Sequence, residues 1–117
     1  MFVLCVILSV LLALAALASA AAKLTKQPRV IESITGVGVP VRVFGGLATL
    51  EILGALGVLI GLAVPSLGIA AATGLALYFL GAVIAHVRVK DGPQAYGAPI
   101  VLMLLAIAVV VTRAASM

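Results

Sequence analysis

The sequence has 117 residues, of which 66% are hydrophobic and 9% are charged, and its formal net charge is +4. This composition is far more apolar than that of a soluble globular domain, so it predicts an integral membrane protein. The length allows about four spanning helices in a single domain and leaves no room for a soluble catalytic or nucleic-acid-binding domain. We therefore expect the lipid bilayer as the surroundings of the chain, and no nucleic acid as a partner.

Cysteine and histidine are too few for several kinds of redox and metal site. Cys5 is the single cysteine, so the chain has neither an intramolecular disulfide nor a CxxC redox pair. His86 is the single histidine, which excludes a bis-histidine haem within one chain, and no set of zinc ligands can be assembled. We predict no metal site and no intrinsic cofactor.

Four apolar segments, taken in chain order, predict an all-α transmembrane four-helix bundle. The first span covers residues 2–22, and the polar connection that follows contains a short interfacial helix at 28–36. The second and third spans, 43–64 and 67–87, are separated only by Pro65 and Ser66, so they form an antiparallel hairpin. A hydrophilic turn at 88–95 leads to the fourth span, 97–115, with Pro99 suited to a helix start.

Glycines mark the faces on which these spans can touch, because helices in a bilayer associate by close backbone approach across small residues. On the second span several glycines fall in one narrow stripe, and a similar face of small residues on the third span includes two more. The predicted helix-packing residues are Gly46, Gly54, Gly57, Gly61, Gly74 and Gly81.

Glu51 is a carboxylic acid well inside the second span. A charged acid at the centre of a membrane helix costs on the order of 3 kcal/mol on insertion scales, so it should be protonated, paired or turned toward a polar interior. Lys23 closes the first span, Arg42 opens the second and His86 closes the third, all at one end of the bundle. We predict a polar pocket that opens at that end, with Glu51 at its floor. The alternative for the basic residues is a role as interfacial anchors.

The basic residues also predict the orientation. Six of them lie in or beside the first and third connections, and only Arg113 lies on the opposite side; the six are Lys23, Lys26, Arg29, Arg42, Arg88 and Lys90. By the positive-inside rule, both long connections are cytoplasmic and both termini are outside, in a multi-pass protein of the cell membrane.

Several short motifs together resemble the DoxX-like family of small four-helix membrane proteins. They are Ala21-Ala22-Lys23-Leu24, Gly38-Val39-Pro40, the segment from Gly45 to Glu51 continued by Leu53-Gly54-Ala55-Leu56-Gly57, and the histidine that ends the third span. The family is named after a small subunit of thiosulfate:quinone oxidoreductase, and other members are linked to membrane redox complexes. The resemblance implies that Lys23, Glu51 and His86 occupy the family's recurrent polar positions.

Three functions are compatible with these residues. The first is a subunit of a membrane redox complex, without its own cofactor, whose pocket at Glu51 binds a quinone or relays its proton. The second is a non-catalytic scaffold or lipid-binding bundle, with a membrane protein partner or a second copy on its glycine faces. The third is a small proton-coupled exporter, although exporters of this length place the acid in their first span among aromatic residues. The sequence leaves open whether the protein is an enzyme.

Overall fold

The computed structural model describes residues 1–25, 28–36, 38, 41–88 and 93–117. Its elements are α1 (Phe2–Leu24), α2 (Pro28–Thr35), the 3-10 turn η1 (Val41–Val43), α3 (Phe44–Ile60), α4 (Pro65–Arg88) and α5 (Pro93–Ala115). The four long helices form a bundle, as predicted, and the described residues contain no strand. A backbone whose hydrogen bonds are all made within each helix is what a bilayer requires.

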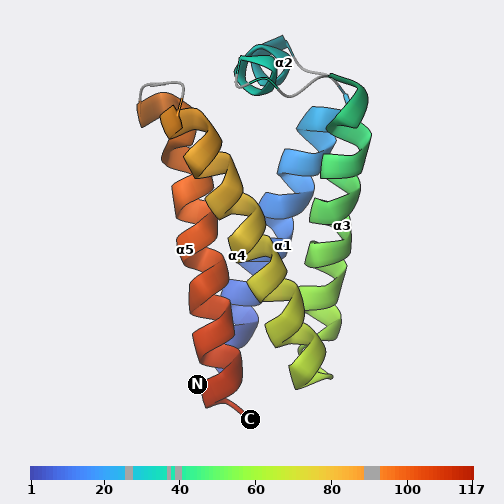
Figure 1. Ribbon diagram of the computed structural model, residues 1–117. Coiled ribbons are helices and arrows are strands. Elements are labelled where there is room, and N and C mark those ends of the chain that lie inside the picture. Colours follow the sequence, from blue (N-terminus) through green and yellow to red (C-terminus); the bar gives the residue numbers. More distant parts are fainter. Residues whose placement is uncertain (26–27, 37, 39–40, 89–92) are drawn as a thin grey trace.

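The long helices run up and down in chain order, and each packs against two others (Figure 1). Helix α1 lies against α3 and α5, and α4 lies against α3 and α5, so the four form a closed ring. Both termini lie at one end of the bundle, and α2 lies across the other end (Figure 1). The main buried core draws apolar side chains from all four helices: Leu12, Val58, Ala72, Leu75, Phe79, Ala106 and Val109.

Within the part of the chain that the structure describes, three helices are long and apolar enough to cross a membrane, namely α1, α4 and the part of α5 from Gly97 to Ala115. Helix α3 is also apolar but has 17 residues, fewer than the predicted second span of 43–64. Residues 61–64 form a turn instead, closed by bonds such as Ala63 N–H to the Ile60 carbonyl at 2.9 Å. Proline disfavours helical geometry in the residue before it, which explains a turn ahead of Pro65.

Prolines set the beginnings of α4 and α5 earlier than predicted. Pro65 and Ser66 are not a linker but the first residues of α4, where a proline loses no helical hydrogen bond. Pro93 begins α5 in the same way, and Pro99 lies inside that helix rather than at its start. The central residues of the predicted turn, 89–92, lie outside the described residues.

Candidate functional site

Lys23 and Glu51 form an ion pair inside the bundle. The Lys23 Nζ atom lies 2.5 Å from Glu51 Oε1, and it also donates a hydrogen bond of 2.8 Å to Ser19 Oγ. The exposed fraction is 0% for the Glu51 side chain and 10% for that of Lys23. Lys23 is therefore not an interfacial anchor with its head group in water, because its ammonium group is turned inward onto the acid.

Helix geometry explains how the two groups meet. Lys23 lies in the last turn of α1, and side chains of a helix lean toward its N-terminus, here into the bundle. Glu51 lies about 10 Å along α3 from the start of that helix. It belongs to the buried face of α3 together with Phe44, Ala48 and Ala55. Because this face packs on α1, the ammonium group of Lys23 lies beside the carboxylate of Glu51.

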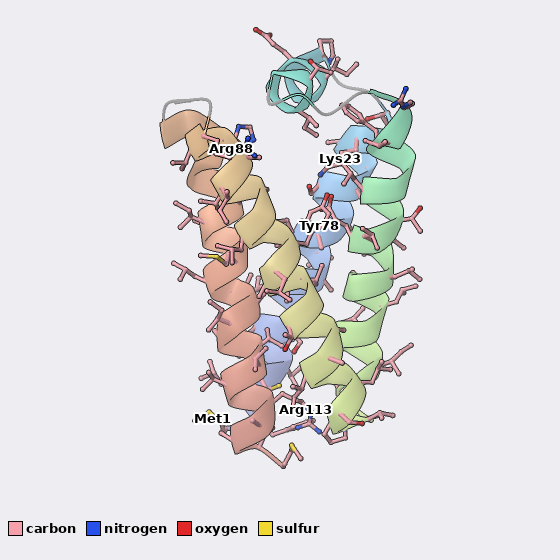
Figure 2. All side chains as sticks on the ribbon, viewed as in Figure 1. Met1, Lys23, Tyr78, Arg88 and Arg113 are labelled. Carbon is pink, nitrogen blue, oxygen red and sulfur yellow. The ribbon has the colours of Figure 1, made fainter. Side chains whose placement is uncertain are left out.

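Tyr78 on α4 is a third member of this polar cluster. Its hydroxyl donates a hydrogen bond of 2.9 Å to Glu51 Oε1, and Lys23 Nζ lies 5.9 Å from the centre of its ring. Figure 2 shows Lys23 and Tyr78 directed toward each other from α1 and α4. We call Lys23, Glu51 and Tyr78 the polar network. It joins three helices at one point in a low-dielectric interior, where each hydrogen bond is electrostatically stronger than in water.

The two oxygen atoms of Glu51 have different surroundings. Oε1 accepts from both Lys23 and Tyr78, whereas Oε2 is buried and has no hydrogen-bond partner among the described residues. An unsatisfied oxygen of a buried carboxylate is costly, and native structures contain few such atoms. Oε2 therefore has unused capacity to accept a hydrogen bond from a ligand.

An apolar groove lies beside the polar network, between α3 and α4. Its volume is about 380 Å³, which is within the range of small-molecule sites. Its lining is Leu50, Leu53, Gly54, Gly57, Leu67, Ala70, Ala71, Gly74, Leu75 and Tyr78. Leu50, Leu53 and Leu67 are exposed on the outer surface of the bundle, so the groove opens toward lipid. Tyr78 is the one lining residue that also belongs to the polar network.

The groove differs from the pocket predicted from the sequence. We expected a polar cavity at the end of the bundle that carries Lys23 and Arg42, with Glu51 at its floor. The groove lies on the side of the bundle and Glu51 does not line it, so it is a different feature, and the pocket at the end of the bundle stays a prediction. Tyr78 connects the groove to Glu51, because it lines the groove and its hydroxyl bonds to the acid. It was not among the predicted site residues, although it is the single aromatic residue on the small-residue face of the third span.

Arg42 and His86, the other two residues of the predicted pocket, have different surroundings. The Arg42 side chain is exposed in η1 at the start of α3, as an interfacial anchor would be. His86 is buried in the last turn of α4, with 6% of its surface exposed. It follows Tyr78 by eight residues, about 12 Å of helix rise, so it lies closer to the α2 end of the bundle than Tyr78 does.

The predicted packing glycines divide into two groups. A Cβ atom added at Gly54, Gly57 or Gly61 would lie within 2.7 Å of an atom of α4, so these residues allow the close approach of α3 and α4. Gly61 makes the tightest of these contacts, because its added Cβ would lie 2.1 Å from the Cα of Gly68. An added Cβ at Gly46, Gly74 or Gly81 would meet no atom of the described residues within 4 Å, so no close helix contact within that part of the chain explains these three glycines.

Arg113 holds the opposite end of the bundle together, far from the polar network (Figure 2). Its Nε donates a hydrogen bond of 3.0 Å to the carbonyl of Gly61 at the end of α3, and its Nη1 donates one of 2.6 Å to Ser116 Oγ. The guanidinium also lies 5.5 Å from the centre of the Phe2 ring. A cation near the C-terminus of a helix is stabilised by the helix dipole, so we assign Arg113 a structural role.

Comparisons with known proteins address the identity of the whole chain. The family model described as the DoxX-like family matches residues 7–109, which includes all three members of the polar network. Neither the comparison with curated proteins nor the comparison with solved structures gives a match. A match over this length, on a bundle of apolar helices with the expected intramembrane acid, shows that the chain is a multi-pass membrane protein and belongs to the DoxX-like family.

Proposed function

We propose that the chain is a subunit of a membrane redox complex, and that its polar network handles the proton of a quinone whose ring lies in the groove between α3 and α4. One observation carries this proposal. Tyr78 both lines a groove that opens toward lipid and donates a hydrogen bond to a fully buried carboxylate. A lipid-soluble ligand can therefore enter from the membrane and reach Tyr78, whose hydroxyl is bonded to the acid, without crossing water.

The chemistry of a quinone fits these surroundings. A quinone takes up protons when it is reduced and releases them when it is oxidised, so its site needs a group that can accept or supply a proton. Glu51 is such a group, and ionisable residues within membrane spans commonly belong to proton relays. The chain has one cysteine and one histidine, too few for a CxxC pair or a bis-histidine haem, so we assign the electron transfer to a partner protein.

Filling the groove tests this proposal. Gly74 lines the groove, and an added Cβ there meets no atom within 4 Å, so Gly74→Leu places a side chain in the groove without a clash at the Cβ. Gly81→Leu is a matched control, because Gly81 lies on the same helix with equally open surroundings but does not line the groove. Quinone content is measured by solvent extraction of protein purified from its native membrane in mild detergent.

We expect wild type and Gly81→Leu to retain quinone in a fixed ratio to protein, and Gly74→Leu to retain at least about tenfold less. Equal quinone content in both variants, or none in the wild type, would contradict the proposed site.

A second candidate function is lipid binding, which is favoured by the lining of the groove. Apart from Tyr78, every lining residue is apolar or glycine, so the groove also suits the hydrocarbon chain of a phospholipid. The same extraction separates the two functions. A phospholipid retained in fixed ratio by the wild type and lost in Gly74→Leu, with no quinone present, would favour the lipid-binding bundle.

We also propose that the protein lies in the cell membrane with both termini outside. The proposal is supported by the excess of basic residues beside α2 and by the position of both termini at the opposite end of the bundle (Figure 1). A reporter enzyme that is active only outside the cytoplasm, fused after Met117, should be active; an inactive but intact fusion would contradict this orientation.

A further inference from the structure

The polar network has more unused acceptor capacity than donor capacity. Tyr78 uses its single O–H on Glu51 Oε1, and Lys23 uses two of its three N–H groups on Glu51 and Ser19. Glu51 Oε2 is fully buried and accepts from no described residue. An ionised carboxylate oxygen only accepts hydrogen bonds, so the group that would best complete this site is a hydrogen-bond donor.

Tyr78 shows which kind of donor the site accepts. Its phenol ring lies edge-to-face against Phe79 at a centroid distance of 5.2 Å, and Lys23 Nζ lies 5.9 Å from the ring centre. Its phenolic O–H donates to Glu51. An aromatic ring that carries a hydroxyl can therefore meet an ammonium group and a carboxylate at this point, with both contacts favourable.

The two redox states of a quinone differ in these properties. The reduced state, a quinol, has two phenolic hydroxyls that can donate to a carboxylate. The oxidised state has two carbonyl oxygens, which only accept, so neither of them can satisfy Oε2. A carbonyl oxygen directed at Oε2 would place two acceptors together in a buried site, which is unfavourable.

The geometry points to a site that binds the phenolic, reduced state of the head group in preference to the quinone. This inference rests on the proposed function, because it assigns the redox state of the ligand in the same groove. The head group enters between α3 and α4 and meets the network at Tyr78, which is the lining residue in contact with Glu51. Because Glu51 itself does not line the groove, this inference requires the Tyr78 side chain to turn aside so that a ligand hydroxyl can reach the carboxylate.

The test compares three small probes of nearly the same shape. Duroquinone, duroquinol and the dimethyl ether of duroquinol are each titrated against the wild-type protein in lipid nanodiscs, without oxygen. A hydrogen bond to a charged group corresponds to roughly a tenfold difference in affinity, so duroquinol should bind about tenfold or more tightly than duroquinone. The ether has no O–H, and it should bind no more tightly than duroquinone.

Two substitutions at the network sharpen this comparison. Glu51→Gln replaces the acceptor pair by an amide, which offers N–H donors where Oε2 stood, so the preference should disappear or turn toward duroquinone. Tyr78→Phe keeps the ion pair and vacates one position on Oε1, so the preference for duroquinol should persist or increase. If Glu51→Gln does not fold, Tyr78→Phe still tests the inference. Loss of the preference for duroquinol in Tyr78→Phe would contradict the role assigned to Glu51.

The outcomes separate this inference from the proposed function. Equal binding of the two redox states by the wild type, or tighter binding of duroquinone, would overturn the inference and leave the quinone site in place. Binding of neither probe, together with the same quinone content in Gly74→Leu and Gly81→Leu, would overturn the proposed function itself.

Discussion

Helix α3 makes two contacts of opposite kinds. Toward α1 it presents Glu51, which is joined to Lys23 by a buried ion pair. Toward α4 it presents Gly57 and Gly61, at which an added Cβ would collide with Ala71 and Gly68. The ion pair depends on charge and on the exact partner, whereas the glycine contact depends only on the absence of side chains.

The difference between these contacts indicates which of them serves stability. Close glycine packing lets two helices of a hairpin touch without burying any polar atom, and Arg113 then closes the same end of the bundle by bonding to the Gly61 carbonyl. A buried ion pair is weak evidence for a stabilising role, because the desolvation of both charges offsets much of their attraction. The unsatisfied Oε2 increases that cost. We therefore expect the glycine contact to serve packing, and the ion pair to serve the proposed function.

Lys23→Met should have the largest effect on stability. It leaves Glu51, which is fully buried, without its cation, and breaking a buried pair by removing one partner typically costs about 3–5 kcal/mol. Reversible unfolding in mixed detergent micelles would measure this loss.

The double variant Lys23→Met with Glu51→Met is the matched control for this prediction. Replacement of a whole buried pair by apolar residues of similar size is often neutral, so the double variant should recover most of the lost stability. We expect quinone binding to be lost in Lys23→Met and not to return in the double variant, because neither protein has the ion pair. A double variant that is as unstable as Lys23→Met would show that the ion pair stabilises the contact of α1 with α3. The glycine contact would then not be the main source of stability.

Gly61→Ala should have the next largest effect. Its Cβ would lie 2.1 Å from a backbone atom of Gly68, so α3 and α4 must move apart, and overpacking of this kind costs typically about 1–3 kcal/mol. The same unfolding measurement applies. Gly45→Ala is the control, because Gly45 lies near the start of α3, the helix that Gly61 caps, and its added Cβ meets no described atom within 4 Å. Equal stability of the two variants would mean that the glycine contact does not hold the hairpin.

Much of this bundle could be predicted from hydropathy and from single residues. The apolar runs and the alternation of basic connections lead to four helices, and the high cost of a charge in lipid directs attention to Glu51. Proline positions were predicted less well. Pro65 and Pro93 both begin helices, whereas Pro99 lies within one, and local preference alone does not decide between these two uses of proline.

The members of the candidate site could be predicted only in part. Lys23 and Glu51 were both named from the sequence, but the rotation and depth of each helix decide which polar groups meet, and these follow from packing. Tyr78 meets Glu51 because of how α4 packs on α3, and Arg42 stays exposed because η1 precedes the buried part of α3. Three of the six predicted packing glycines, Gly46, Gly74 and Gly81, have open surroundings, since glycine is common in membrane helices for several reasons.

Tyr78→Phe should have the smallest effect on stability, because it removes one hydroxyl and keeps the ring, the ion pair and the glycine contact. Hydrogen bonds between membrane helices contribute about 0.6 kcal/mol on average, so we expect a loss of that order. The same substitution in the background of Lys23→Met with Glu51→Met should cost almost nothing, because the acceptor at Glu51 is gone. The difference between the two costs measures the Tyr78–Glu51 bond itself. An equal loss in both backgrounds would mean that the hydroxyl acts through some other partner, and Tyr78 would then no longer connect the groove to the acid.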